Sequence, residues 1–225
     1  MKKVDCHPLP LDTKLANKLK KKSNSLVNKY IPSKGKEYKW PPTVAEIKTY
    51  GVAGNTFRAY TGMKPYKPSV LYRQWARATV EKLIRENKLK EYVCTEKSFE
   101  KWHKKLAQSL EQSWHKNTEG KVSLSVAQKY KLVDLFVKWL SRFNFGDQII
   151  SDGLIQNAHA ALDSKILGKM NQLCQGNLHK PKNVSMSFIK EQKNYICYQN
   201  ALRYICNQLG STPLIFDYYA WNEAE

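Results

Sequence analysis

The amino-acid sequence predicts an all-α protein. Apolar residues recur at intervals of three and four in one segment after another, which is the period of an amphipathic helix. Serine, threonine or aspartate, which are residues that cap helices, stand near the start of several of these segments. No series of segments shows the alternation of apolar and polar residues that predicts strands. With 42% apolar residues, a chain of 225 residues can bury the core of one two-lobed domain or of two small domains.

The first predicted helix covers residues 11–30. Asp12 is suited to its N-cap, and a proline-containing break follows its last turn. Its apolar positions are Leu15, Leu19, Leu26 and Tyr30. After the break, Thr43 and Glu46 have the spacing of a capping box, which predicts a short helix that ends near Gly51.

Residues 54–70 are predicted to form a loop. They mix glycine, proline, aromatic and basic residues, a composition that suits contact with a nucleic-acid backbone and equally an ordinary surface turn. The candidate DNA contacts in it are Arg58, Lys64 and Lys67. Two helices are predicted next, the second of them after Ser98. Their apolar positions are Leu71, Trp75, Thr79 and Leu83 in the first and Phe99, Trp102, Leu106, Leu110 and Trp114 in the second.

The helix predicted near residues 125–140 places one lysine among apolar residues. At about 100° per residue, Lys129 falls inside an apolar arc. That arc consists of Val126, Tyr130, Val133, Phe136, Val137 and Leu140. Lys131 and Lys138 fall on the opposite side, where a solvated charge is expected. One ammonium, that of Lys129, is therefore predicted to face the interior.

The first turn of this helix gives Lys129 a possible chemical role. Ser125 and Gln128 form a capping-box pattern just before it. Unpaired N–H groups, the positive end of the helix dipole and burial all disfavour a charged amine there. An amine held neutral can act as a nucleophile or form a Schiff base. The alternative is that the stem packs and the ammonium reaches solvent.

Asp163 stands at the N-cap position of a later predicted helix. The apolar face of that helix contains Ile166, Leu167, Met170 and Leu173. Most aspartates in such positions only cap the helix. Asp163 lies 163 − 129 = 34 positions after Lys129, and a loop at residues 144–153 would allow the two helix starts to meet. We therefore expect Lys129 and Asp163 to face one cleft.

The C-terminal segment is the predicted pocket. Gly210 and Pro213 stop a long helix whose apolar positions include Tyr195, Leu202, Ile205 and Leu209. Asp217 is expected to cap a final turn, and the aromatic residues that this turn presents are Tyr218, Tyr219 and Trp221. Rings in this place suit either a sandwich around a flipped base or core packing.

The charge predicts a polyanionic partner. Basic residues outnumber acidic ones by 38 to 19, for a net charge of +19, and 38 − 6 = 32 of the basic residues are lysines. Lysine binds phosphate as a point charge and is less suited than arginine to sequence-specific contacts with bases. Ribosomal, RNA-binding and membrane-surface proteins have a similar positive charge. No membrane-spanning run or signal peptide is recognisable, so a soluble, cytoplasmic monomer is expected. The five cysteines show no spacing typical of a metal site, so we expect reduced thiols, with no metal and no cofactor. They are Cys6, Cys94, Cys174, Cys197 and Cys206.

Three segments, SVAQKYKLVDLFVKWL, ALDSKIL and FDYYAWNE, resemble the 8-oxoguanine-glycosylase-like proteins of the helix-hairpin-helix DNA glycosylase superfamily. The resemblance covers residues 120–225 and implies a two-lobed helical fold with a DNA-binding cleft between the lobes. It divides the chain into a basic N-terminal helix and linker (1–42), a helical lobe (43–118) and a catalytic lobe (119–225). The hairpin contacts to DNA would be Lys121, Ser123, Ser125 and Gln128. The superfamily hairpin reads close to L-P-G-V-G-x-K, whereas this chain has VSLSVAQK.

The resemblance also implies a partner and a reaction. The partner is double-stranded DNA with a modified base, which flips into a pocket against Trp221. Asp163 would stabilise positive charge on the deoxyribose, and Lys129 would attack C1′ or only position the base. Because the hairpin is divergent, we expect hydrolytic base release with at most weak strand cleavage. Related bacterial proteins include anti-phage enzymes that remove glucosylated hydroxymethylcytosine. The same divergence favours that base over 8-oxoguanine.

Two other functional classes are compatible with parts of the sequence. A metal-dependent nuclease requires clustered carboxylates, whereas the seven aspartates here are dispersed along the chain. A non-catalytic nucleic-acid-binding protein explains the positive charge as well as a glycosylase does. Such a binding protein would release no base from any modified DNA.

Overall fold

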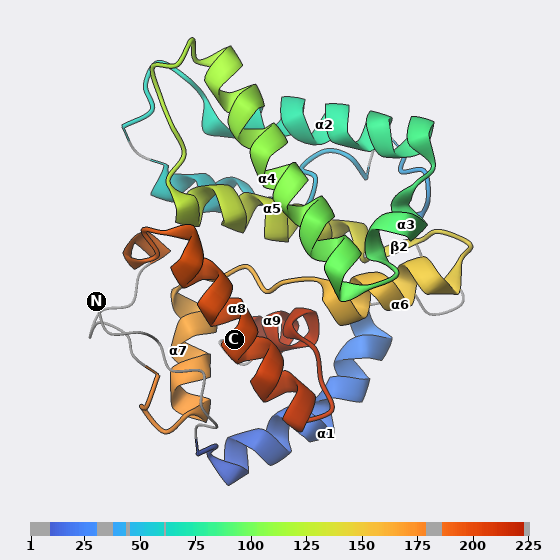
Figure 1. Ribbon diagram of the computed structural model, residues 1–225, viewed down its shortest axis with the longest axis vertical. Helices are drawn as coiled ribbons and strands as arrows, with labels where there is room; N and C mark the ends of the chain where they lie inside the picture. Colours follow the sequence, from blue (N-terminus) through green and yellow to red (C-terminus); the bar gives the residue numbers. More distant parts are fainter. Residues whose placement is uncertain (1–9, 31–37, 44–45, 61, 179–185, 223–225) are drawn as a thin grey trace.

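The chain is mostly helical, as the sequence predicts (Figure 1). The structure is a computed structural model that describes residues 10–30, 38–43, 46–60, 62–178 and 186–222. Its α-helices are α1 (Thr13–Tyr30), α2 (Pro68–Glu86), α3 (Leu89–Val93), α4 (Glu96–Asn117), α5 (Val126–Leu140), α6 (Gln148–Asn157), α7 (Ser164–Leu173), α8 (Gln192–Gln208) and α9 (Pro213–Asn222). Within the described ranges, no helix has the length and apolar character needed to cross a membrane.

Short 3-10 helices and a minimal sheet complete the fold. The 3-10 helices are η1 (Gly54–Ala59) and η2 (Met186–Phe188). The strands β1 (Tyr38–Lys39) and β2 (Phe143–Asn144) pair in parallel, with Tyr38 opposite Phe143. This pairing attaches the segment after α1 to the residues that follow α5.

The helices form two groups, with α5 at their junction. Figure 1 shows α2, α3, α4 and α5 in one half of the molecule and α1, α7, α8 and α9 in the other. Helix α6 contacts both α3 and α9, and α5 contacts both α4 and α8. The first helix packs against the last, since α1 contacts α9. The chain therefore returns at its C-terminal end to the helix with which the described part begins.

Helix α5 is buried on nearly all sides. Leu132, Phe136 and Val137 are fully buried in the core, and so is Asp134 on another side of the helix. Sequence reasoning assigned one side of this helix to solvent, and that assignment is wrong. The physical reason is that α5 lies between the two groups of helices, so protein covers the side that carries its charged residues.

Several predicted helix starts are confirmed. The Leu15 N–H donates to Asp12 Oδ1 at 2.8 Å, as expected of an N-cap. The capping box of Ser125 and Gln128 is formed at the start of α5. Asp163 is the N-cap of α7, with its side chain accepting from the N–H groups of Lys165 and Ile166.

Other predicted boundaries are wrong. Helix α4 begins before Ser98, because Ser98 closes a capping box with the N-cap Thr95. Residues 46–51 form turns and not a helix, since Tyr50 and Gly51 have positive φ angles of 46° and 80°. In the loop predicted at residues 144–153, the Asp147 side chain accepts from the Ile149 N–H and helix α6 begins.

The C-terminal segment also differs from its prediction. Asp217 lies in the interior of α9 and caps no turn. The cap is upstream, where Thr212 Oγ1 accepts from the Ile215 N–H at 3.3 Å and Pro213 occupies the first helical position. The residues that follow Asp217 are therefore distributed around a helix, and they do not project together from one turn.

Candidate active site

Lys129 and Asp163 do not share a cleft. Lys129 Nζ lies 2.9 Å from Glu111 Oε2, whereas Lys131 Nζ lies 3.3 Å from Asp163 Oδ2. Residues two positions apart on an α-helix differ by about 200° around the axis, so the side of α5 that faces Asp163 is that of Lys131. The prediction that pairs Lys129 with Asp163 is therefore wrong, and the carboxylate has a different lysine.

Two lysine–aspartate ion pairs lie along this side of α5. Lys131 pairs with Asp163, and Lys138, two turns later, pairs with Asp217 of α9. The lysine side chains are only 15% and 18% exposed, and the aspartates 10% and 1%. Sequence reasoning placed both lysines in solvent. That prediction is wrong because the start of α7 and helix α9 cover this side of α5.

The Asp163 carboxylate has partners on both oxygens. Its Oδ1 accepts from the backbone N–H groups of Lys165 at 3.0 Å and Ile166 at 3.1 Å. Its Oδ2 accepts from the Lys131 ammonium. Asp163 therefore caps α7 and also fixes a charged side chain of α5, so the two helices are joined through one carboxylate.

The Asp217 carboxylate is fully buried beside Lys138. One oxygen accepts from the Lys138 ammonium and the other from the Ala161 N–H at 2.8 Å. Burial raises the pKa of Asp217 above its ordinary value, although Lys138 and the Ala161 N–H act in the opposite direction. The negative charge of Asp163 contributes to the increase. The two carboxylates are thus close enough to interact, and each has its own lysine.

A cavity of about 330 Å³ opens beside Lys138. Its walls come from α1, from residues 51–56, from α5 and from α9. The aromatic lining residues are Tyr30, Trp139, Tyr218 and Trp221, and the polar ones include Asn55, Thr56, Lys138 and Arg142. The rings of Tyr30 and Tyr218 are stacked, with centroids 4.3 Å apart and planes 5° apart. Lys138 Nζ lies 4.1 Å from the centroid of Tyr218. An ion-paired ammonium therefore borders an aromatic wall.

The predicted pocket residues divide into three kinds. Tyr218 and Trp221 line the cavity, and Trp221 is 39% exposed with Lys165 Nζ 4.0 Å from its ring centroid. Asp217 lies behind the wall and holds Lys138. Tyr219 is outside the lining of this cavity and packs near Phe216 in the core. The alternative of core packing thus holds for Tyr219 and also for Tyr218, which is 6% exposed, while Trp221 alone of the three is exposed.

The predicted DNA-contacting loop and hairpin lie together. The Tyr60 hydroxyl donates to the Gln128 carbonyl, and the Tyr66 hydroxyl donates to the Thr118 carbonyl, each at 3.1 Å. The exposed basic residues of the loop are Arg58, Lys64 and Lys67. Residues 51–56 at the start of this region also line the cavity. One continuous segment therefore connects the cavity wall with the hairpin.

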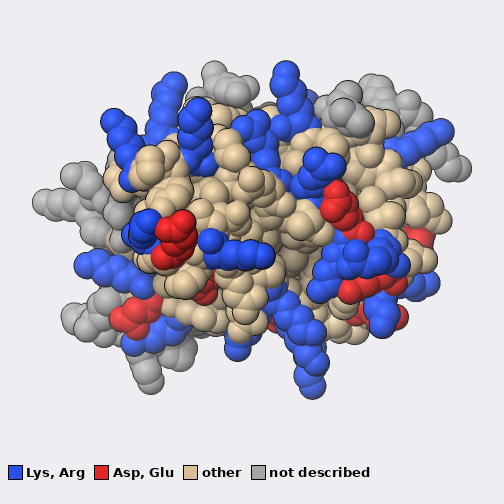
Figure 2. Space-filling view, turned by 90° about the horizontal axis from the view of Figure 1, so that it is seen from above, with Lys and Arg blue, Asp and Glu red and all other residues tan. Residues whose placement is uncertain are grey.

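The hairpin residues are less available than predicted. Ser125 and Gln128 bond to each other's backbone N–H groups in the capping box. Lys121 is exposed and pairs with Glu119 at 2.6 Å, and Ser123 is exposed. Figure 2 shows lysine and arginine side chains scattered over one face and not gathered into a single patch. On this face, the basic residues are therefore spread over the surface.

Sequence reasoning missed Lys131, Lys138, Arg142 and Tyr30 as site residues. The spacing of seven between the two lysines was a usable signal, because it places both on one side of a helix. Comparison with family models, with curated proteins and with solved structures found no match for this chain. The functional conclusion therefore depends on the chemistry of the site.

Proposed function

We propose that the protein is a DNA glycosylase that holds a modified base, extruded from the duplex, in the cavity beside Lys138. The observation that carries the proposal is that aromatic walls and an ion-paired lysine, with buried carboxylates behind it, occur at one cavity. Aromatic faces stack on a flipped base, and 330 Å³ is within the range of about 300–1,000 Å³ for small-molecule sites. The net charge of +19 supports binding to DNA.

The carboxylates supply the electrostatic part of the reaction. Breaking the glycosidic bond leaves positive charge on the deoxyribose, which fixed negative charge in a buried site stabilises. Asp163 is the candidate for this role, and Lys138, which borders the cavity, orients the base. Both Lys131 and Lys138 form ion pairs with carboxylates, which favour the charged ammonium, so neither side chain is a nucleophile suited to attack C1′. The proposed reaction is therefore hydrolysis, with slow strand cleavage or none.

The lining of the cavity favours a base with a hydroxyl-rich substituent. Asn55, Thr56 and Arg142 line it together with the aromatic residues. These side chains offer donors and acceptors that a planar oxidised purine would use only in part. Glucosylated hydroxymethylcytosine, as in phage DNA, is therefore the first proposed substrate, and 8-oxoguanine the second.

The test is base release from DNA that carries each modified base. Hot alkali reveals abasic sites, and borohydride traps a covalent lysine intermediate. We expect alkali-labile sites with little trapping on the preferred DNA. Asp163→Asn should reduce the single-turnover rate at least about a hundredfold, by the scale of one lost electrostatic contact. Lys129→Gln is the matched control, because Lys129 lies on a different side of α5 from Lys131 and pairs with Glu111 of α4. Equal loss in both variants would contradict the assignment.

A non-catalytic nucleic-acid-binding protein is the competing function. The scattered basic surface in Figure 2 favours it, since such a surface needs no cavity. It predicts tight, salt-sensitive binding and no base release from any DNA of a panel of modified substrates. Retained binding with no product across that panel would establish this function in place of the glycosylase.

A further inference from the structure

A second buried polar cluster lies on α5, away from the cavity. It contains His103 of α4, Asp134 of α5, His159 of the segment before α7, and Tyr195 of α8. These residues are 2%, 1%, 4% and 2% exposed, respectively. One ligating atom from each of His103, Asp134 and His159 lies within 4.8 Å of those of the other two. Four separate elements therefore converge on one small volume.

The contacts within this cluster are short. His103 Nε2 lies 2.7 Å from Asp134 Oδ1. The Tyr195 hydroxyl oxygen lies 2.8 and 3.0 Å from the two Asp134 oxygens and 2.9 Å from His159 Nδ1. On its other side, His159 Nε2 lies 2.7 Å from Glu100 Oε1. The two imidazoles, the carboxylate and the phenol thus place their polar atoms around one point.

The cluster has fewer protons than its contacts require. Four groups of contacts each need a hydrogen: His103 with Asp134, Tyr195 with Asp134, His159 with Tyr195, and His159 with Glu100. Two neutral imidazoles and one phenol supply about three for these contacts. With both imidazoles neutral, the set is therefore one hydrogen short, and a cation bound among the donor atoms would replace the contacts that lack it.

We propose that this cluster is a binding site for a divalent transition-metal cation, with Zn²⁺ as the first candidate. The donors are His103 Nε2, His159 Nδ1, an Asp134 oxygen and the Tyr195 oxygen, whose hydroxyl proton would be released to solvent when the cation binds. Nitrogen and oxygen donors in fourfold coordination suit Zn²⁺. Tetrahedral bonds of about 2.0–2.1 Å place neighbouring donors about 3.3 Å apart, so the contacts of 2.7, 2.8 and 2.9 Å would have to open by about half an ångström. The contact from His159 Nε2 to Glu100 matches the carboxylate that metal-bound imidazoles commonly engage on their other nitrogen.

The position of the cluster gives the cation a structural role. Asp134 lies between Lys131 and Lys138 on α5, and His159 precedes Asp163 by four residues. A metal that joins them would fix the segment that carries Asp163 against α5. All four donors are buried, so the site has no open position for a substrate. The inference does not depend on the proposed glycosylase, because metal content is measured on the protein alone.

The first measurement is the metal content of the full chain. Protein expressed with added Zn²⁺ and then dialysed should retain one equivalent per chain by elemental analysis. Replacement by Co²⁺ should give ligand-field bands without a thiolate-to-cobalt charge-transfer band, which distinguishes this site from the cysteines. Native or refolded protein that takes up no stoichiometric Zn²⁺ or Co²⁺ would overturn the proposal, as would a thiolate band.

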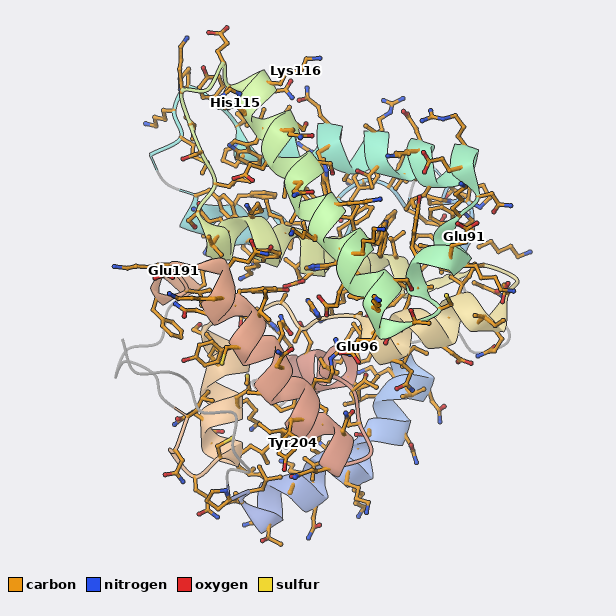
Figure 3. All side chains as sticks on the ribbon, viewed as in Figure 1. Glu91, Glu96, His115, Lys116, Glu191 and Tyr204 are labelled. Carbon is orange, nitrogen blue, oxygen red and sulfur yellow. The ribbon has the colours of Figure 1, made fainter. Side chains whose placement is uncertain are left out.

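Two variants and one control locate the site. His159→Gln should abolish retention of Zn²⁺, and Glu100→Gln should weaken affinity by about 10- to 100-fold. His115→Gln is the control, since His115 is exposed and lies near the far end of α4 from Glu96 in Figure 3. If His159→Gln fails to fold, Glu100→Gln decides, because Glu100 is at the edge of the cluster with 44% of its side chain exposed. Unchanged affinity in Glu100→Gln together with normal uptake in any folded His159 variant would place the metal elsewhere.

Discussion

Replacing Lys138 by methionine should destabilise the protein in a strongly pH-dependent way. Methionine preserves much of the buried stem but removes the ammonium, and Asp217 is left fully buried with the Ala161 N–H as its remaining donor among the described residues. An unpaired buried carboxylate is costly, and breaking a buried pair typically costs about 3–5 kcal/mol. The carboxyl group can limit that cost by taking up a proton.

The upper limit on the free-energy cost of the substitution follows from the ordinary pKa of aspartate, 3.8. Keeping such a group neutral at pH 7 costs about 1.4 kcal/mol for each pH unit above that value, or about 4 kcal/mol in all. The cost should therefore be at most about 4 kcal/mol at pH 7 and should fall toward zero near pH 4. The sign follows from Lys138, which lowers the pKa of Asp217 in the wild type against the increase caused by burial. Without Lys138 the folded variant holds more protons than folded wild type, so the variant recovers stability relative to wild type as pH falls.

Urea unfolding of wild type and Lys138→Met at pH 7, 6, 5 and 4 measures this difference. The matched control is Lys121→Met, because Lys121 also pairs with a carboxylate but both side chains are exposed, at 65% and 73%. That control should change stability by less than about 1 kcal/mol at any pH. A second variant, Lys138→Met with Asp217→Leu, should recover most of the loss at pH 7. A difference between wild type and Lys138→Met that is below about 1 kcal/mol, or that does not vary with pH, would refute the reasoning.

Three further predictions concern packing, backbone pairing and charge. Gly51→Ala should cost at least about 2 kcal/mol in urea unfolding, because a Cβ there would lie 2.3 Å from Trp139 Cβ; Gly62→Ala, at a similar φ with no atom within 4 Å, should cost only about 1 kcal/mol. Gln199→Leu should cost about 2–3 kcal/mol, since Gln199 bonds both the N–H and the carbonyl of Ala160, whereas exposed Gln108→Leu should leave the melting temperature nearly unchanged. DNA affinity should fall about a thousandfold or more between about 50 and 200 mM salt, and salt-independent binding would contradict the electrostatic interpretation.

The helices were predictable because their signals are local. Asp12, Ser125 and Asp163 cap helices by bonds to N–H groups two or three residues away, and such spacings are visible in a sequence. Helix α6 was missed because its short segment contains polar residues and a glycine. That glycine, Gly153, packs against the Val93 carbonyl, where a Cβ would lie 2.4 Å from the oxygen. A contact of this kind depends on α3 and is invisible in the local pattern.

The candidate site was only half predictable. Of the residues identified from the sequence, Tyr218 and Trp221 line the cavity and Asp217 holds Lys138 at its wall, whereas Asp163 pairs with Lys131 outside the lining. The lysine partner of Asp163 was predicted wrongly, because the prediction assumed that α5 has only one buried side. When both sides are buried, periodicity no longer distinguishes an interior lysine from a solvated one. The identity of the partner then depends on which helix covers each side, which is tertiary information.

Helix α5 carries charged groups into the core on more than one side, and stability alone does not explain them. Lys131 and Lys138 meet carboxylates of other elements, and Asp134 meets His103 and Tyr195. Buried ion pairs are often no more stable than apolar residues of similar volume, so a helix selected only for packing would carry leucine or methionine at these positions. Lys138 and Asp217 instead place an ion pair beside a cavity with aromatic walls, and Asp163 is near enough to raise the pKa of Asp217. In the proposed reaction, fixed carboxylates would stabilise positive charge on the deoxyribose, so the place to test for that reaction is the cavity beside Lys138 and not Lys129.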